Sequence, residues 1–217
     1  MNELRIFIGF DSRQPLAHTV AYTSLIRNAS RPVSITPLIL EQLPMQRRGL
    51  TEFTFSRYLV PWLMDYQGVG VFLDADVLVV GDIWEILTEN SGEPICVVKS
   101  VQRFEWPSVM LFNCARCTAL TPEYIDKETP QSLEWADSIG ELSKPWNHLV
   151  GYEPPNPHAK IVHFTMGIPC FPETEDIAGG EWRETWASIA KTALHTVSWQ
   201  EMMGNSTHRR RVLRDQP

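Results

Sequence analysis

The chain lacks an apolar run of about eighteen residues, the length that a helix needs to cross a bilayer. We therefore expect no transmembrane helix. The first residues also lack the charged and apolar regions of a signal peptide, and they lead directly into an apolar segment. We expect a cytoplasmic protein, with peripheral attachment to a membrane left open. Internal repeats, low-complexity segments and a domain linker are absent as well, so the pattern predicts one globular domain.

Cysteine and positive charge are both scarce. The 217 residues include only four cysteines, and Cys114 and Cys117 form a lone C-x-x-C motif. A structural zinc site needs a second such pair or suitably spaced histidines, so we expect reduced, structural cysteines. The net charge is −7, which argues against a non-specific grip on nucleic-acid phosphates. This acidity better suits a substrate that brings its own cation.

The residues that are present have the composition of an ordinary soluble domain, with 43% hydrophobic and 21% charged residues. Residues 1–204 carry the patterned sequence and are expected to form the domain. Residues 205–217 form a basic tail that includes Arg209, Arg210 and Arg211 and is expected to be flexible. The tail would either be solvated or touch an anionic membrane or polyanionic acceptor.

Apolar segments alternate with helical ones along the first 80 residues. The expected strands are 4–10, 33–40, 69–73, 95–98, 109–112 and 161–164. The expected helices are 15–28, 55–64, 83–87, 133–142 and 181–193. This alternation indicates an α/β domain whose largely parallel sheet is flanked by helices.

The most informative segment is the apolar run 71–73 followed by Asp74, Ala75 and Asp76. On a strand, residues i and i+2 point the same way, so both carboxylates should converge at the strand's carboxyl end. Open α/β sheets bind ligands at that end. Paired carboxylates repel each other, and a hard divalent cation would relieve the repulsion while leaving positions open for phosphate oxygens. The pair therefore indicates a metal–diphosphate site, although a turn with capping carboxylates would show the same motif.

Further candidates for the site follow or precede the expected strands. Asp11 would either accept hydrogen bonds from a base or ribose or cap the next helix. Arg57 would reach a diphosphate with its planar fork of donors, or stay a surface arginine. His163 is a suitable third ligand for manganese beside two carboxylates. His148 and His158 compete with it in the same region.

Candidates for the sugar-binding side are less clearly patterned. Ser108 and Asn113 flank a short strand and could hydrogen-bond a polyol. Glu134 and Asp137 are candidate catalytic carboxylates on the acceptor side, against the alternative of a solvated helix face. Three more residues form a candidate wall for stacking on a sugar, with core packing as the alternative: Trp146, Asn147 and Tyr152.

Taken in chain order, these segments resemble the GT-A nucleotide-sugar glycosyltransferases. The resemblance is strongest to the retaining, family-8-like group that includes glycogenin and bacterial lipopolysaccharide galactosyltransferases. The segments that carry it are 6–11, 55–58, 71–79, 106–113, 146–147 and 163–169. The resemblance implies a GT-A (Rossmann-like) fold with a mixed, mostly parallel sheet, and sugar transfer with retention from a nucleoside-diphosphate sugar, most simply a UDP-sugar.

The resemblance also implies roles for single residues. Asp74, Asp76 and His163 would hold Mn²⁺ or Mg²⁺. The donor would contact Gly9, Phe10, Asp11, Arg57, Asp74, Ala75, Asp76, Ser108, Asn113 and Gly167. The sequence departs from the family where Gly167 comes one residue later than usual and no lysine follows, so the metal and Arg57 would neutralise the phosphates. The acceptor (carbohydrate, lipid-linked sugar, protein or modified nucleic-acid base) stays open, as does the oligomeric state.

Two other functions stay open at this point. Aspartate-nucleophile phosphohydrolases also end an apolar strand in D-x-D, but normally at the first strand, and their downstream lysine and acidic pair are not found here. A non-catalytic subunit that binds nucleotide-sugars would keep the same fold. The chain retains both carboxylates, the arginine and the histidine, which argues against such a degenerate domain.

Overall fold

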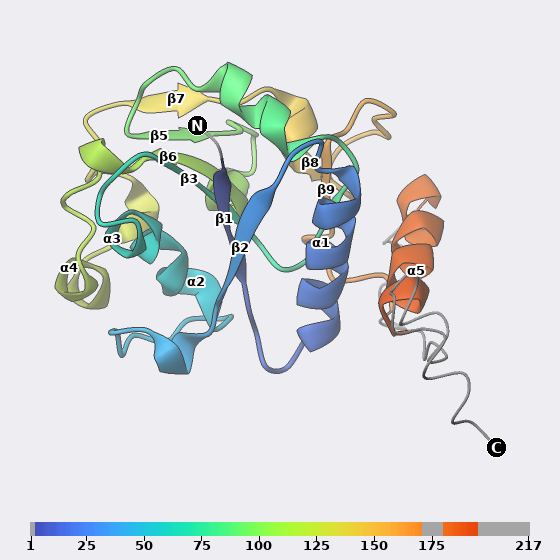
Figure 1. The fold of residues 1–217 in the computed structure, drawn as a ribbon, viewed down its shortest axis with the longest axis horizontal. Coiled ribbons are helices and arrows are strands. Elements are labelled where there is room, and N and C mark those ends of the chain that lie inside the picture. Colours follow the sequence, from blue (N-terminus) through green and yellow to red (C-terminus); the bar gives the residue numbers. More distant parts are fainter. Residues whose placement is uncertain (1–2, 171–179, 195–217) are drawn as a thin grey trace, which may run out of the picture.

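The computed structural model describes residues 3–170 and 180–194 and shows a mixed sheet flanked by helices (Figure 1). The main sheet has the strand order β2-β1-β3-β6-β5-β7. Its strands are β1 (Leu4–Gly9), β2 (Val33–Leu38), β3 (Val69–Leu73), β5 (Ile95–Val97), β6 (Val109–Asn113) and β7 (Ile139–Glu141). β1 pairs in parallel with β2 and β3, and β5 with β7, whereas β6 runs antiparallel to β3 and β5. The expected α/β architecture with a mixed, mostly parallel sheet is confirmed.

A second, smaller sheet has the order β4-β9-β8. It consists of β4 (Val77–Val79), β8 (His148–Leu149) and β9 (Ile161–His163). Residues 74–76 form the turn that carries the chain from β3 in the main sheet to β4 in the small one. This corrects the expectation that Asp74 and Asp76 share one face of a strand. Their convergence depends on the turn and on the strands beside it.

The helices are α1 (Pro15–Asn28), α2 (Phe53–Ser56), α3 (Val60–Leu63), α4 (Pro122–Lys127) and α5 (Gly180–Leu194). A 3-10 turn over Arg57–Leu59 separates α2 from α3, so the single helix expected over 55–64 is interrupted. Pro61 then occupies the first turn of α3, where its missing N–H costs no bond. The segment expected to be helical at 83–87 is the 3-10 helix Ile83–Glu89.

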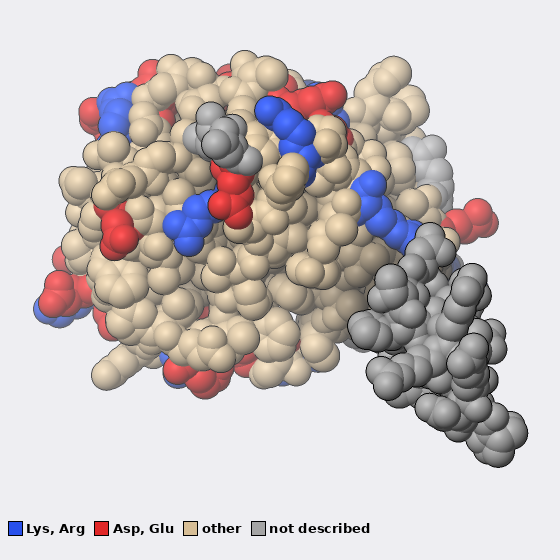
Figure 2. All heavy atoms as spheres, viewed as in Figure 1, with Lys and Arg blue, Asp and Glu red and all other residues tan. Residues whose placement is uncertain are grey.

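The helix expected over 133–142 is wrong. Leu133 ends a 3-10 turn in the left-handed region with a φ of 60°, and the chain then enters strand β7. The basic tail lies outside the described residues. Within the described ranges, no helix combines the length and the apolar character that spanning a bilayer requires. Figure 2 shows basic and acidic side chains interspersed over the face seen in Figure 1, without a large basic patch.

Alternation along the buried strands builds a core on each face of the main sheet. Leu4, Ile6 and Ile8 of β1 join Leu25 of α1 in one buried cluster. Phe7 points the other way and packs in the cluster that holds the residues of α2 and α3. Burial on both faces is typical of parallel strands in α/β proteins, and it leaves the strand ends as the place for a ligand.

The outer edge of β4 is completed by polar side chains of α1. The Val79 N–H donates to Ser24 Oγ at 3.0 Å, and Asn28 Nδ2 donates to Val79 O at 3.0 Å. Ser24 is fully buried. These two bonds satisfy a strand edge that would otherwise be unpaired, and they fix the small sheet, and with it the turn at 74–76, against α1.

Ser24→Ala should lower the free energy of unfolding by about 1–3 kcal/mol, because the buried Val79 N–H loses its acceptor. Thr19→Ala is the matched control, since the Thr19 hydroxyl donates to Pro15 O within the same helix. Urea unfolding of both variants measures the difference. Equal losses of unfolding free energy in the two variants would show that the bond from Val79 to Ser24 stabilises the protein no more than a hydroxyl that bonds within its own helix.

Candidate metal and nucleotide-sugar site

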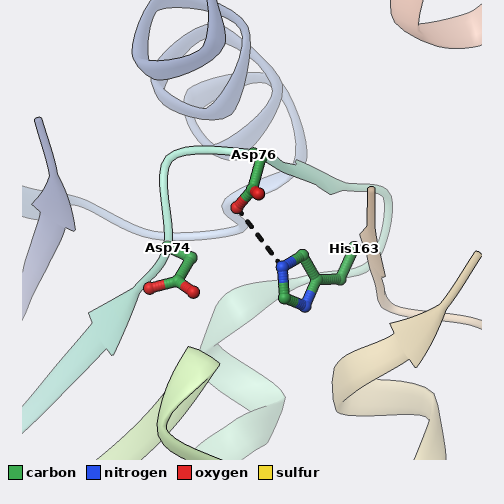
Figure 3. Close-up of side chains that lie close together, drawn as sticks. All are labelled: Asp74, Asp76 and His163. Atoms are coloured by element: carbon green, nitrogen blue, oxygen red, sulfur yellow. Dashed lines mark ion pairs between the residues drawn. The ribbon is translucent and has the colours of Figure 1, made fainter. Parts of the chain in front are cut away.

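Asp74 and Asp76, from the turn after β3, converge with His163 of β9 at the carboxyl end of β3 (Figure 3). One potential ligand atom from each lies within 4.8 Å of the other two. The turn is fixed from both sides, because Asp74 N–H donates to Ser108 O at 2.9 Å and Asp76 O accepts from Phe164 N–H at 3.0 Å. The register of β4 on β9 brings the histidine beside the turn. The structure thus brings together the three residues that the sequence analysis assigned to the metal.

The donor set fits a hard divalent ion. Adjacent ligands of an octahedral ion with bonds near 2.1 Å lie about 3 Å apart, and His163 Nε2 lies 3.3 Å from Asp76 Oδ1. Asp74 Oδ1 and Asp76 Oδ1 are buried, and each has one partner at ion-pair distance, Arg57 and His163 respectively, without the geometry of a hydrogen bond. Both oxygens therefore keep lone pairs for a cation.

The other ring nitrogen of His163 is held by residues that sequence reasoning did not assign to the metal. Nδ1 lies 3.1 Å from Asn147 Oδ1 and 3.6 Å from the Glu105 carboxylate. A proton on Nδ1 donated to Asn147 leaves the Nε2 lone pair on the side of Asp76, the usual arrangement of a metal-binding histidine. Glu105 is itself buried and accepts from the hydroxyls of Ser108 and Thr165. The Ser108 hydroxyl is therefore already engaged.

Opposite charges compensate each other within the cluster. Arg57 Nη1 lies 2.9 Å from Asp74 Oδ1. Burial raises the pKa of Asp74 to about 7, although Arg57 opposes this. Burial alone would lower the pKa of His163, but the carboxylates of Asp76, Glu105 and Asp74 raise it to about 9. Burial would raise the pKa of Asp76, yet the adjacent His163 holds it below its usual range. Without a metal, protons and Arg57 thus balance the buried carboxylates.

The cluster lies in a cleft of about 480 Å³. Arg57 lines this cleft from the 3-10 turn and is fixed by bonds to Phe53 O and Pro107 O. Four exposed apolar side chains also line it: Leu50, Phe104, Tyr152 and Met166. The rings of Phe104 and Tyr152 meet edge to face with centroids 6.3 Å apart.

The candidate sugar wall therefore has a different composition from the expected one. Tyr152 lines the cleft, as expected. Trp146 is fully buried, with its Nε1 donating to Glu89 at 2.8 Å, and belongs to the core. Asn147 holds His163 instead of facing a sugar. Phe104, which no local pattern marked, takes the place of Trp146 beside Tyr152.

An adjoining pocket of about 260 Å³ lies on the side of Asp11 and includes Ala75 and Gly167. Asp11 is buried at this rim, and its carboxylate is held by Arg13 Nε at 2.9 Å and Nη2 at 2.6 Å. These bonds hold the pKa of Asp11 below its usual range. The alternative that Asp11 caps α1 is wrong, because Gln14 occupies the cap position.

Two residues expected to contact the donor have structural surroundings instead. A Cβ added at Gly9 would lie 2.5 Å from the Phe53 ring, so glycine is needed there for close packing. Phe10 packs edge to face on His18, with ring centroids 5.5 Å apart. Neither lines the cleft or the pocket beside Asp11.

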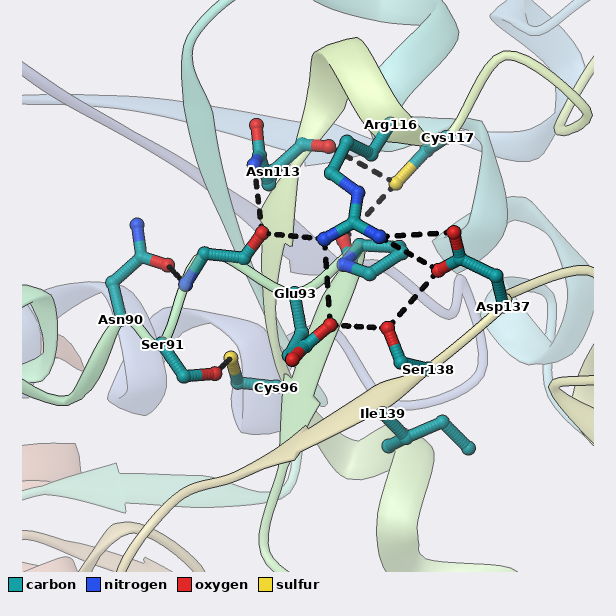
Figure 4. Close-up of polar contacts among 12 residues, drawn as sticks. Asn90, Ser91, Glu93, Cys96, Asn113, Arg116, Cys117, Asp137, Ser138 and Ile139 are labelled. Carbon is teal, nitrogen blue, oxygen red and sulfur yellow. Dashed lines mark hydrogen bonds and ion pairs between the residues drawn. The ribbon is translucent and has the colours of Figure 1, made fainter.

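Asn113 and Asp137 lie at the opposite end of the main sheet. β6 is antiparallel to β3, so Val109 pairs with Leu73, next to Asp74, and Asn113 pairs with Val69. Asn113 is therefore four residues along the strand, or roughly 13 Å, farther from Asp74 than Val109 is. Asp137 is held there by Arg116 Nη2 at 2.8 and 2.9 Å (Figure 4). Glu134 is exposed and lines neither the cleft nor the pocket beside Asp11. This placement corrects the assignment of Asn113 to the donor and of Glu134 and Asp137 to acceptor-side catalysis.

The other residues of metal-binding type have structural surroundings. Cys114 and Cys117 are free and buried, and burial raises the pKa of their thiols to about 11 and about 12. His148 is buried with Nδ1 3.3 Å from Glu153. His158 is exposed. Within residues 3–170 and 180–194, only the cluster at 74, 76 and 163 groups three such residues.

Comparison with known proteins gives one sequence relative and several structural neighbours. No family model matches the chain. "Protein CDI" of Arabidopsis thaliana is 33% identical in an alignment of length 222. The match covers 84% of this chain and 84% of that protein. The glycosyltransferase GlyE of Streptococcus pneumoniae TIGR4 is similar in structure, with a TM-score of 0.63, 17% identity, and coverage of 94% of this chain and 62% of that chain.

Two further solved structures have the same fold. The bifunctional glycosyltransferase WbbM has a TM-score of 0.62 and 14% identity, covering 87% of this chain and 52% of its own. The galactosyltransferase LgtC, in complex with donor and acceptor sugar analogues, has a TM-score of 0.56 and 13% identity, covering 92% and 99%. The chain thus spans about half of WbbM and three fifths of GlyE. These likenesses confirm the expected GT-A fold.

Asp74→Asn should weaken Mn²⁺ binding by at least about 100-fold. Loss of a residue that only orients a metal ligand costs up to about 100-fold in affinity, and loss of a ligand should cost at least as much. Asp65→Asn is the matched control, because it removes the same charge from an exposed position. Electron paramagnetic resonance of free Mn²⁺ during a titration measures the affinity. Unchanged affinity in Asp74→Asn would remove this residue from the metal site.

Proposed function

The chain belongs to the same family as "Protein CDI" of Arabidopsis thaliana, and we propose that it is a metal-dependent glycosyltransferase. It moves a sugar from a nucleoside-diphosphate sugar to an acceptor. The observation that carries this proposal is the cluster of Asp74, Asp76 and His163 in a cleft at the carboxyl end of β3. The GT-A fold around it, which the structural neighbours share, supports the same activity.

The donor is a UDP-sugar and the ion is Mn²⁺ or Mg²⁺, with Mn²⁺ favoured by the imidazole ligand. The pocket beside Asp11 takes the nucleoside, because it adjoins the cleft through Asp76, Thr51 and Thr165. The diphosphate then lies at the metal cluster and the sugar in the cleft. Gly167, at the rim of the nucleoside pocket, has a φ of 120°, a conformation that few other residues adopt.

Arg57 has two tasks in this scheme. Its contact with Asp74 favours the ionised carboxylate against burial, and a metal ligand has to be ionised. It also brings positive charge to the cleft where the diphosphate would lie, in place of the lysine that this sequence lacks. A bound ion would stabilise the charge that develops on the departing diphosphate.

Transfer takes place with retention, as in the family-8-like enzymes that the sequence resembles. Glu105 is the buried carboxylate of the cleft, but its oxygens accept from Ser108 and Thr165. It is therefore engaged as a positioning group near His163 and is a poor nucleophile. A same-face reaction follows, in which a leaving-group oxygen takes the proton of the acceptor hydroxyl.

The two rival functions are weaker. A phosphohydrolase would place a nucleophilic aspartate close to a lysine, whereas Asp74 has Arg57 beside it. A non-catalytic nucleotide-sugar-binding subunit could lose one of the charged groups of the site and keep its fold, whereas this chain keeps Asp74, Asp76 and His163 together. The structural neighbours are glycosyltransferases, which favours neither rival.

The test is release of UDP from UDP-glucose, UDP-galactose and UDP-N-acetylglucosamine, each with and without Mn²⁺ and without an acceptor. Slow, Mn²⁺-dependent hydrolysis of one donor is expected, because water replaces the acceptor. Asp76→Asn should abolish this turnover while the fold is kept, and Asp65→Asn should leave it unchanged.

Three results would contradict the proposal. Full activity of Asp76→Asn with undiminished metal dependence would refute the metal assignment. Release of phosphate from p-nitrophenyl phosphate, with every donor untouched, would favour the phosphohydrolase. Metal-dependent UDP binding without turnover, with or without sugar acceptors, would favour the binding subunit.

A further inference from the structure

A smaller pocket of about 200 Å³ lies beside the metal cleft. It shares Thr54, Arg57 and Phe104 with the cleft. We call it the arginine pocket, because Arg57 and Arg103 both line it, together with Tyr58 and Gln131. The arginine pocket and the cleft therefore adjoin each other.

Two residues that line the arginine pocket each have a buried polar atom without a hydrogen-bond partner among the described residues. The Tyr58 hydroxyl and Gln131 Oε1 make no hydrogen bond within the described ranges. Tyr58 is fully buried. A buried, unpaired polar group costs about 1–3 kcal/mol and is uncommon in native proteins. Burial also raises the pKa of Tyr58, so its hydroxyl keeps its proton at neutral pH and is available as a donor.

The charge in this pocket is positive. Arg103 forms no ion pair with the described residues, and its guanidinium lies 5.3 Å from the ring of Trp106. Arg57 is paired with Asp74 on the cleft side. None of the described residues that line the pocket carries a carboxylate, although the whole chain carries a charge of −7. Two guanidinium groups and a hydroxyl donor form a set that suits an oxyanion.

The arginine pocket and the nucleoside pocket adjoin the cleft through different residues. The nucleoside pocket shares Thr51, Phe53, Asp76, Thr165 and Met166 with the cleft, and none of these lines the arginine pocket. A donor that reaches from the nucleoside pocket to the metal cluster therefore leaves the arginine pocket to the other substrate.

We propose that the arginine pocket binds the oxyanion of an anionic sugar acceptor, a phosphate or carboxylate group held by Arg103, Arg57 and Tyr58. Gln131 would bond a sugar hydroxyl, and Phe104, 66% exposed at the boundary, offers an apolar face to the ring. The pocket, with a volume of about 200 Å³, has room for one charged group and part of a sugar ring. Only the acceptor role rests on the proposed function.

The binding test uses the full chain without metal. Glucose 6-phosphate, glucuronate and glucose are titrated by calorimetry, which separates phosphate from carboxylate and both from the neutral sugar. At least one anion should bind, and glucose should not. Arg103→Gln should weaken that binding by about 10- to 100-fold, because a hydrogen bond to a charged group is lost. Arg27→Gln, which removes an exposed arginine of α1, is the control and should change nothing.

Tyr58→Phe separates a binding role from a structural one. The hydroxyl has no hydrogen-bond partner among the described residues, so its removal should leave the melting temperature unchanged or higher while weakening anion binding by about threefold to tenfold. A lower melting temperature with unchanged binding would show that the hydroxyl has a structural partner, such as a buried water, and would count against the proposal.

The donor test then keeps the two proposals apart. Mn²⁺-dependent donor hydrolysis by Arg103→Gln should keep the wild-type KM for the donor. A raised KM would assign the pocket to the donor and overturn the acceptor role. Failure of both anions to bind, or binding that ignores Arg103→Gln, would overturn the site itself. Anion binding that depends on Arg103, in a chain that turns over no donor, would refute the glycosyltransferase and leave the site standing.

Discussion

The placement of two carboxylates in one turn, Asp74 buried and Asp76 partly buried, is the constraint on which the rest of the site depends. Asp74 and Asp76 sit where the chain leaves the main sheet for the small one, and an ionised carboxylate away from water costs several kcal/mol unless it is paired. Positive groups therefore have to meet them from elsewhere in the fold. Arg57 comes from the turn between α2 and α3, and His163 from the end of β9. The fold thus places a cationic partner beside each of the two carboxylates. A bound metal ion would displace the protons from Asp74 and His163, because metal and proton bind to the same atoms.

This arrangement explains why the small sheet matters for a chemical site in the main one. β4 begins directly after Asp76 and pairs with β9, so the register of two short strands fixes the distance between carboxylate and imidazole. α1 satisfies the other edge of β4 through Ser24 and Asn28. Asn147, beside β8, then sets the orientation of the imidazole ring. Packing and backbone pairing therefore position the ligands more than any feature of the D-x-D segment alone.

The sequence predicts the parts of this site that local pattern controls. An apolar run that ends in carboxylates identifies the end of β3, and the last apolar run identifies His163, because strands bring their ends to a common edge. Asn147 and Glu105 meet His163 through contacts between residues 16 and 58 positions apart, which no periodicity encodes. Asp137 has the right chemistry, but β7 carries it to the opposite end of the sheet, where Arg116 binds it. The sequence analysis expected a helix over 133–142. A helix there would not have determined at which end of the sheet Asp137 lies, whereas pairing of β7 with β5 does.

The net charge of −7 would repel anionic substrates from the chain at long range. Such repulsion acts over about one Debye length, roughly 8–10 Å at physiological salt, so inside a narrow cleft the local charges decide. Three arginines lie at the proposed sites: Arg13 holds Asp11 beside the nucleoside pocket, Arg57 is paired with Asp74 in the metal cluster, and Arg103 lines the arginine pocket. A neutral acceptor would gain nothing from the last of these. An acceptor with its own oxyanion would be attracted to the arginine pocket, which the donor leaves empty. Each substrate would then have its own binding position, and the charges of the two substrates would not need to be in contact.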